Sequence, residues 1–453
     1  MTFSIAAGQS EQLAVNSEPV TETEREMSEC WLCRAPSQVT CSACPASSCS
    51  ASHHRLHSEA GGGQGCLPAR ILYREGVGNT VVAATDIRPG QTILTEQPAV
   101  WGPNLKSGPK CCNCLARWRG FTCPDCQFPV CDEACARGPH HTIECGLLAS
   151  LDIDITFSLG EAANPAMSLI NVVRLLRLGV TSPDTASRVM MLMDHTSEIM
   201  ACPELREMWE VTAVKPLTRG LGPSSPFSAG DVMRAVGVLQ TNTVSLAVPG
   251  QRHGLYTALY PTFSFLSHSC ICNAKFNILR DRTLHLVAQT HIKAGEEITI
   301  QYTTPMLGNV QRQQKISKNW YFDCCCARCS DPSELGTNLS GVLCPLSSCQ
   351  GVLLPRPGLP QYSCTAQPCP GSLSHLQVAA MEAELQAELD QTEPADVGAL
   401  QKVLSSWQTK LASSHFLVLL IKRKLLAALK LITTPERETL TREQILSDLD
   451  QNN

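Results

Sequence analysis

Residues 263–276 read FSFLSHSCICNAKF, an apolar segment that contains a Ser-His-Ser-Cys run. Taken alone, the run allows three interpretations: part of a catalytic centre, a metal ligand, or an apolar strand that happens to hold polar side chains. A second segment, NWYFDCCCARCS at 319–330, contains a C-x-C-x2-C pattern that offers three of the four ligands of a closed zinc site, Cys324, Cys326 and Cys329. Cys270 is the natural fourth ligand, so the two segments predict one zinc ion between them. Cys272 and Cys325 have no part in this site.

The composition excludes several classes of protein. The chain has 453 residues, enough for two or three domains, and a formal net charge of −5 that argues against direct sequence-specific nucleic-acid binding. Its first residues lack the features of a secretory signal, and lysine and arginine interrupt its most apolar late segment, FLVLLIKRKLLAALKLI, so we expect no membrane span or membrane partner. The expected compartment is therefore reducing, and metal binding is the leading use of the 25 cysteines.

The clearest cysteine group, at 111–145, contains four ligand pairs: Cys111 with Cys114, Cys123 with Cys126, Cys131 with Cys135, and His141 with Cys145. A C-x2-C pair turns two thiolates toward one metal, and residues four apart share one face of a helix, so the eight ligands fit two zinc ions. The alternative is a set of scattered structural thiols; Cys112 is left over in either case. The pattern resembles a MYND finger, a module that binds partner proteins, often through proline-rich peptides. This resemblance implies that Cys111, Cys114, Cys131 and Cys135 hold one zinc, and Cys123, Cys126, His141 and Cys145 the other.

An earlier group, at 30–66, repeats the order and nearly the spacing of these pairs, which indicates a second, degenerate MYND-like finger. Its first zinc is expected on Cys30, Cys33, Cys49 and His53. A second zinc would need two partners for Cys41 and Cys44, and the best candidates are His57 and Cys66. Because the glycine-rich stretch before Cys66 makes that pair a loop rather than a helical pair, occupancy of the second site stays open.

A later group consists of two C-x4-C pairs, Cys344 with Cys349 and Cys364 with Cys369, separated by a short apolar stretch. Two turn-like pairs of this kind predict a small ribbon around one zinc ion. The alternative is a proline-rich loop with unpaired thiols.

Three stretches follow the order of a SET domain: ALYPTFSFLSHSCICNAKF, HIKAGEEITIQYT and WYFDCCCARC. An N-terminal SET piece is visible in YREGVGNTVVAATDIRPGQTILTEQPAV, which predicts a glycine-containing turn and two short strands. With the 111–145 finger inserted after these strands, the chain resembles the SMYD family of SET and MYND domain lysine methyltransferases over about 71–331. The extra N-terminal finger and the Cys ribbon are more similar to the arthropod branch of that family.

The resemblance implies methyl transfer from S-adenosylmethionine to a lysine of a histone or another protein, within transcriptional or chromatin regulation. Tyr302 matches the family's active-site tyrosine. The positions that match cofactor contacts are Gly76, Gly78, Asn242, Ser267, His268 and Phe322. The expected location is the nucleus, the cytoplasm or both.

Five positions depart from the family pattern, among them Cys272, which replaces a proline after the Ser-His-Ser-Cys run. Ser267 replaces an asparagine that offers both a donor and an acceptor, Glu75 and Val77 replace basic or polar residues of the first turn, and Trp320 replaces a tyrosine of the lysine channel. A second hypothesis therefore stands beside the enzyme: a catalytically weak or inactive adaptor whose fingers recruit partners and whose SET fold is a scaffold.

The rest of the chain is predicted to be mainly helical. Apolar spacing predicts helices at 166–179, with Gly179 as the stop, at 182–196 with Ser182 as cap, and at 228–241 with Ser228 as cap. The tail is expected to hold three or four helices, at 375–389, 395–411, 415–431 and 442–449, as in a shortened TPR-like region. The methionines at 190–193 are expected in a helix core.

The fold class expected is α+β: a SET β-fold with an inserted zinc finger and helical insert, a post-SET zinc site and a C-terminal helical region. The expected boundaries are 1–29 disordered, 30–66 first finger, 68–110 SET N-terminal part, 111–145 MYND finger, 150–235 helical insert, 236–305 SET C-terminal part, 306–331 post-SET motif, 340–372 Cys ribbon and 374–453 C-terminal helices.

Overall fold

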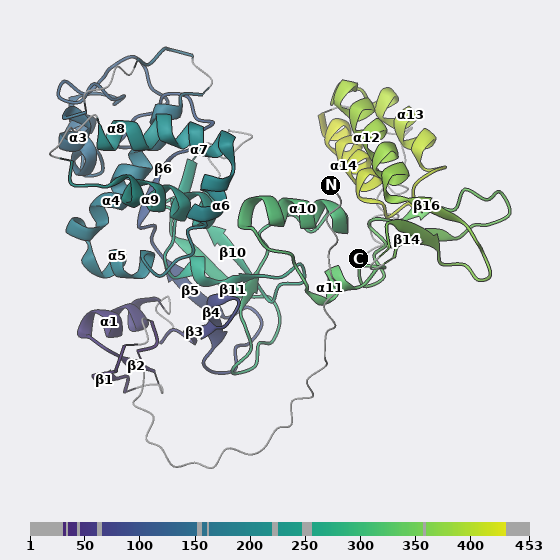
Figure 1. Cartoon of the computed structure of the whole chain (residues 1–453), viewed down its shortest axis with the longest axis horizontal. Helices are drawn as coiled ribbons and strands as arrows, with labels where there is room; N and C mark the ends of the chain where they lie inside the picture. Colours follow the sequence, from purple (N-terminus) through teal and green to yellow (C-terminus); the bar gives the residue numbers. More distant parts are fainter. Residues whose placement is uncertain are drawn as a thin grey trace, which may run out of the picture.

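The computed structural model describes residues 30–32, 35–42, 46–60, 66–151, 156–160, 163–219, 225–246, 256–356 and 359–431. These residues form a large lobe of short strands and helices and a smaller lobe of helices on a four-stranded sheet, with helix α10 between them (Figure 1). Each lobe has its own buried apolar core, and a third, small cluster surrounds Cys270, Ile316 and Cys324. The mixture of short sheets and helices is the α+β class that the sequence predicts.

The strands are short and lie in six small sheets of the described chain. Their bounds are β1 Val39–Thr40, β2 Ser47–Ser48, β3 Ala69–Arg74, β4 Gly78–Ala83, β5 Thr92–Glu96, β6 Val100–Pro103, β7 Val244–Leu246, β8 Tyr256–Leu259, β9 Ser267–His268, β10 Ala274–Ile278, β11 Leu284–Ala288, β12 Thr299–Ile300, β13 Val342–Leu343, β14 Val352–Pro355, β15 Gln361–Cys364 and β16 Ser372–Ser374. The strand orders are β1-β2, β3-β4, β10-β11-β5, β6-β8-β7, β12-β9 and β13-β14-β15-β16.

Most helices of the large lobe gather in its upper part, and a second group of helices lies in the small lobe (Figure 1). Their bounds are α1 Ala51–Ala60, α2 Glu133–Ala136, α3 His141–Ala149, α4 Leu169–Thr181, α5 Pro183–Val189, α6 Thr196–Ala201, α7 Pro203–Trp209, α8 Lys215–Thr218, α9 Ala229–Asn242, α10 Asn309–Trp320, α11 Ala327–Ser330, α12 His375–Gln391, α13 Val397–Trp407 and α14 Phe416–Leu431. None of them is long and apolar enough to cross a membrane, over the residues described.

The glycine-containing turn predicted near residue 76 connects β3 and β4. The two strands pair from Ala69 with Ala83 to Arg74 with Gly78. Gly76 and Gly78 have φ angles of +75° and +91°, a region that residues with a side chain rarely adopt. Glycine is therefore required for this turn by backbone conformation.

The opening segment forms a two-residue strand, β9, which runs parallel to β12. Ser267 pairs with Thr299 and His268 with Ile300. The Ser269 N–H also donates to the Ile300 carbonyl, at 3.0 Å. This pairing places residues 267–270 beside the residues that follow Ile300, although the two segments are separated in sequence.

The helical insert has helices near the predicted positions, but α5 ends at Val189 and does not extend to residue 196, and α6, α7 and α8 were not predicted. Ser228 caps α9 in a capping box with Asp231, as its position before the helix predicts. Gly179 does not stop α4, which continues to Thr181; the helix ends where Pro183 begins α5, since the residue before a proline is disfavoured in the helical conformation. The methionine prediction was also wrong: α5 ends at Val189, so the methionines follow the helix, and Met190 and Met193 are 54% and 56% exposed.

The finger at 111–145 is held on the large lobe by a buried ion pair. Arg174 of α4 donates to both carboxylate oxygens of Glu144 in α3, at 3.0 and 2.7 Å, and also to the carbonyls of Trp101 and Cys112. Glu144 is fully buried and Arg174 is 6% exposed. One guanidinium thus joins the finger, strand β6 and the helical insert.

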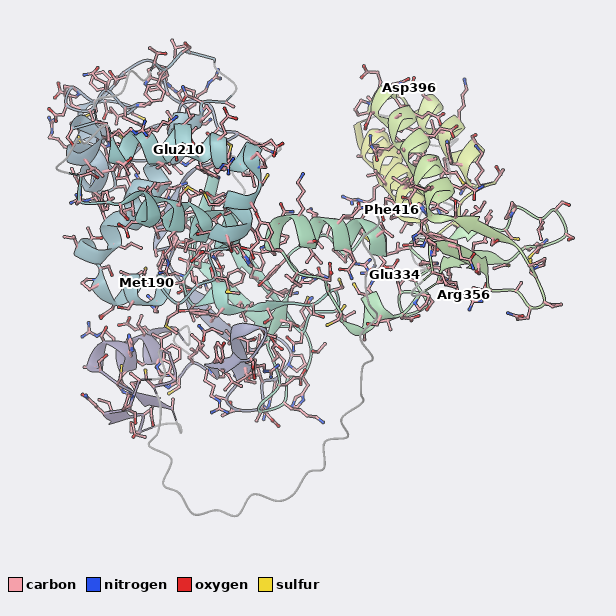
Figure 2. All side chains as sticks on the ribbon, viewed as in Figure 1. Met190, Glu210, Glu334, Arg356, Asp396 and Phe416 are labelled. Atoms are coloured by element: carbon pink, nitrogen blue, oxygen red, sulfur yellow. The ribbon has the colours of Figure 1, made fainter. Side chains whose placement is uncertain are left out.

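A second buried cluster of charge joins the two lobes. Glu334 accepts hydrogen bonds from Arg312 of α10 and Arg328 of α11, and from the hydroxyl of Ser340 at 2.8 Å. Glu334 lies between the two lobes in Figure 2 and is 1% exposed. Two arginines and one carboxylate are therefore buried where the post-SET segment meets the small lobe.

The small lobe contains three of the four predicted C-terminal helices: α12, α13 and α14 agree with the expected 375–389, 395–411 and 415–431. The predicted helix at 442–449 and the predicted disordered start at 1–29 lie outside the described residues.

Replacing Glu334 by alanine should destabilise the junction by about 3–5 kcal/mol, because two buried guanidinium groups lose their counter-charge. Urea unfolding followed by circular dichroism measures this loss. Glu133→Ala is the matched control, because Glu133 and its partner Arg137 form an exposed pair at 3.2 Å whose loss should cost about 0–1 kcal/mol. Equal unfolding midpoints for the two variants would contradict a role of Glu334 in the junction.

Candidate functional site

The parallel pairing of β9 and β12 brings His268 and Tyr302 together. The backbone N–H of Tyr302 donates to Nδ1 of His268 at 3.0 Å, so in the neutral ring the proton lies on Nε2. Nε2 lies 3.3 Å from the sulfur of Cys270. Burial lowers the pKa of His268 to about 4. The imidazole is therefore neutral and joins the Tyr302 backbone to a cysteine sulfur.

The hydroxyl of Tyr302 is fixed in the same way. It donates to the backbone carbonyl of Leu266 at 2.5 Å, which leaves the oxygen lone pairs for another group. Burial raises the pKa of Tyr302, so the phenol keeps its proton at neutral pH. Tyr302 is thus a neutral hydroxyl with a fixed direction.

An aromatic group surrounds Tyr302. The rings of Trp320 and Phe322 lie 5.0 and 6.5 Å from the Tyr302 ring, between centroids. Between them in sequence, Tyr321 has a φ of 58° and its ring lies 4.9 Å from that of His195 instead. Trp320 donates its indole N–H to the Thr241 carbonyl, while Phe322 is 38% exposed. Phe322 therefore offers an open aromatic face beside the tyrosine.

The side chain of Asn242, at the end of α9, is fixed by hydrogen bonds to backbone carbonyls. Its amide nitrogen donates to the carbonyls of Met193 at 2.7 Å and Val238 at 2.9 Å. Both amide hydrogens are used, so the side-chain carbonyl is the atom that could accept from a ligand. Asn79 of β4 donates to the Met191 carbonyl at 3.2 Å, so two asparagines fix the loop that leads to His195.

The β3–β4 turn is open to solvent. A side chain built on Gly76 or Gly78 would meet no atom within 4 Å, and Val77 is 54% exposed. The glycines thus leave the backbone of this turn accessible to a ligand, although their φ angles alone already require glycine.

The side chain of Ser267 contacts the β3–β4 hairpin. Its hydroxyl lies 2.9 Å from that of Thr80, which donates to Glu297; Glu297 in turn accepts from Arg74 at 2.8 Å. Thr80 is fully buried. The Ser267 hydroxyl is therefore part of a network that joins β9 to the β3–β4 hairpin.

Cys270 lies with the three cysteines of the later motif. The ligand atoms of Cys270, Cys324, Cys326 and Cys329 are all within 4.8 Å of one another. Helix α10 supports this group: Gln313 forms two hydrogen bonds with the backbone of Cys324, and Arg312 donates to the sulfur of Cys329 at 3.6 Å. The two cysteines left out of the prediction stay outside the group, Cys325 being exposed and Cys272 donating to Gln289.

The finger at 111–145 brings its eight predicted ligands into two groups. They are Cys111, Cys114, Cys131 and Cys135, and Cys123, Cys126, His141 and Cys145. His141 turns Nε2 toward Cys126 at 3.5 Å and Nδ1 toward Glu144 at 3.7 Å. Cys112, the leftover thiol, is fully buried, and burial raises its pKa, as for an inert core cysteine.

The earlier finger is described in part. Cys30, Cys49 and His53 lie together, and Cys41 lies 3.3 Å from Cys66, sulfur to sulfur. His57 is fully buried on α1. The predicted ligands Cys33 and Cys44 lie outside the described residues.

Several residues of these sites were not identified from the sequence. Glu144 could have been, because it follows His141 by three residues and so shares its helix face. His195, Thr80 and Gln313 carry no comparable signal, since each reaches its site only through the tertiary fold.

The sequence of this chain is similar to SET-domain proteins and to histone-lysine methyltransferases. The protein family described as SET domain matches residues 78–303 of this chain. SET domain-containing protein SmydA-8, isoform A, of Drosophila melanogaster is 28% identical over 313 residues, which cover 67% of this chain and 65% of that protein. Histone-lysine N-methyltransferase ASHR1 of Arabidopsis thaliana is 26% identical, covering 83% of this chain and 80% of that protein. Histone-lysine N-methyltransferase SMYD3 of Mus musculus is 24% identical, covering 58% of this chain and 62% of that protein.

The match thus spans just under two thirds of the SmydA-8 protein. The SET match extends over both sides of the inserted finger at 111–145. The chain therefore contains a SET domain and is similar to SET and MYND domain proteins of the SMYD type.

Proposed function

We propose that this protein is a protein-lysine N-methyltransferase that uses S-adenosylmethionine and acts on histone or other protein lysines. The observation that carries the proposal is Tyr302: a neutral hydroxyl held by the Leu266 carbonyl, beside Trp320 and Phe322, at the end of the β9–β12 pair. Histone-lysine N-methyltransferases among the relatives support the reaction class.

The residues present fit the cofactor. The side-chain carbonyl of Asn242 is left to accept from its amine, the open turn at Gly76 and Gly78 exposes backbone to it, and Phe322 offers a face for its adenine. When bound, S-adenosylmethionine supplies an activated methyl group on its sulfonium. We assign Ser267 and His268 to the same region, His268 through its neutral ring.

The protein's own contribution is orientation. Because the Tyr302 proton is engaged by Leu266, its oxygen can accept an N–H of the substrate amine and direct the nitrogen lone pair. Trp320, whose ring lies 5.0 Å from that of Tyr302, excludes water from the amine and packs against its methylene stem. Little acid–base chemistry is needed beyond loss of the amine proton.

The zinc assignments follow the four-residue groups. The post-SET ion is held by Cys270, Cys324, Cys326 and Cys329, and the two ions of the MYND finger by the alternating sets of its eight ligands. In the first finger, Cys30, Cys49 and His53 hold an ion with Cys33, and Cys41, Cys44, His57 and Cys66 are the candidates for another. The fingers recruit protein partners in the nucleus or cytoplasm, proline-rich peptides among them.

Tyr302→Phe should lower the rate of methyl transfer about a hundredfold, the loss typical of one oriented hydrogen-bonding group in a transition state. The assay measures transfer from labelled S-adenosylmethionine to purified core histones. Tyr73→Phe is the matched control, since Tyr73 lies in β3 and is 53% exposed. Equal rates for Tyr302→Phe and the wild type would overturn the role of Tyr302.

Ser267→Asn should tighten S-adenosylmethionine binding about tenfold, a gain of about 1.5 kcal/mol. Thr80 donates its only proton to Glu297, so it accepts from residue 267; an asparagine amide can donate one hydrogen to Thr80 and the other to the cofactor. Titration calorimetry measures the dissociation constant. If neither the wild type nor Ser267→Asn binds at millimolar cofactor, the adaptor hypothesis replaces the enzyme.

Cys326→Ser should remove one zinc ion per chain, because three thiolates and a hydroxyl bind zinc more weakly than four thiolates. Elemental analysis after dialysis counts the ions. The adjacent Cys325→Ser is a close control, since Cys325 is exposed outside the group. A full zinc complement in Cys326→Ser, or a loss in Cys325→Ser, would contradict the ligand assignment.

A further inference from the structure

The small lobe contains two copies of one short motif, C-x4-C-x-G. The first runs from Cys344 to Gly351 and the second from Cys364 to Gly371. In each copy the N–H of the first cysteine donates to the glycine carbonyl at 2.9 Å. In each copy the glycine N–H donates back to the sulfur of the second cysteine, at 3.3 and 3.4 Å. The two loops therefore share the same pattern of hydrogen bonds between the cysteines and the glycine.

The sheet brings the two loops to one end. The first loop connects β13 with β14 and the second connects β15 with β16, while β14 and β15 pair antiparallel between them. All four sulfurs lie within 4.8 Å of one another. Cys344 and Cys369 are 3.7 Å apart and Cys349 and Cys364 are 3.6 Å apart, sulfur to sulfur.

These separations fit a metal and exclude disulfides. A disulfide bond would hold its two sulfurs about 2.05 Å apart. A tetrahedral zinc ion with Zn–S bonds of about 2.3 Å separates its sulfurs by about 3.8 Å. The observed spacing is close to the second value.

The glycines supply an independent argument. A Cβ atom on Gly351 would lie 2.5 Å from the sulfur of Cys364, and one on Gly371 would lie 2.5 Å from the sulfur of Cys344. Each glycine thus admits a thiolate from the opposite loop, while its N–H donates to a thiolate of its own loop. The missing Cβ atom leaves space for the sulfur, and the N–H group stabilises a negative charge on it. A loop of unpaired neutral thiols would need neither feature.

We infer that Cys344, Cys349, Cys364 and Cys369 hold one structural Zn²⁺ ion, on which the fold of the small lobe depends. Four thiolates favour a soft, tetrahedral ion and leave no position for a substrate, so the site is structural rather than catalytic.

The position of the four cysteines in the sheet explains why the fold of the small lobe depends on the zinc ion. The strands of this sheet have two to four residues each, too few for a stable sheet by themselves. Yet Leu353, Tyr362 and Cys364 belong to the buried core that α12–α14 share. Backbone hydrogen bonds also join the sheet to the segment between α13 and α14. The Leu343 N–H donates to the Lys410 carbonyl, and the Ala412 N–H donates to the Gly341 carbonyl. The metal therefore fixes the surface on which the helices pack.

The test uses the whole 453-residue chain with two kinds of variant. Cys349→Ser combined with Cys364→Ser should lose one zinc ion per chain by elemental analysis. Gly351→Ala changes no ligand but should release zinc to a chelator at least tenfold faster than the wild type. Its matched control is Gly398→Ala in α13, where a Cβ atom has 3.6 Å to its nearest neighbour.

Hydrogen exchange provides the readout for the lobe. In the double variant, amide protection should fall across α12–α14 and remain in the large lobe, and S-adenosylmethionine binding should be unchanged. This result separates the ribbon from the proposed methyl transfer, since either can fail alone. An unchanged zinc count in the double variant, or unchanged protection of α12–α14 after zinc is lost, would overturn the inference.

Discussion

The geometry around Tyr302 depends on the group of four thiols that joins Cys270 to the 324–329 segment. Cys270 lies two residues after His268, and its sulfur contacts the ring that accepts the Tyr302 N–H. On the other side of the group, Cys324 lies two residues after Phe322. A metal bound by these thiols would fix the segment of His268 and the segment of Phe322 at once. The β9–β12 pair has only two residues in each strand, so backbone hydrogen bonds alone would hold it weakly.

Helix α10 extends this constraint to the rest of the molecule. Its first turns carry Arg312 and Gln313, which contact the cysteine group, and its last residue, Trp320, contacts Tyr302. Arg312 is fully buried and pairs with Glu334 at the junction of the lobes. One helix therefore connects the small lobe, the cysteine group and the aromatic site. A displacement of the small lobe would act on the position of Trp320 through a rigid element rather than through a loop.

The sequence predicted those parts of the structure that have a local signal. Ligand pairs such as Cys111 and Cys114 follow from spacing, because two thiolates of a tight turn converge whatever surrounds them. The cap at Ser228 is local in the same way. The methionine prediction failed because helical spacing does not reveal where a helix ends, and Met190 follows the last turn of α5. Thr80 and His195 could not be placed, since only the tertiary fold brings β4 and the loop before α6 to the site.

Ser267 departs from the family pattern without disrupting the structure around it. An asparagine at this position could serve both β4 and a ligand, whereas the hydroxyl of Ser267 is engaged with Thr80. The network from Thr80 to Glu297 and Arg74 keeps the hairpin in place, so the fold retains the architecture of the site with the smaller side chain. What serine gives up is one direct contact, on the order of 1.5–3 kcal/mol for a bond to a charged group. Under the proposed function, that loss would weaken cofactor binding and leave the Tyr302 and His268 side chains in their present orientation, so a weakly binding enzyme is consistent with serine at this position.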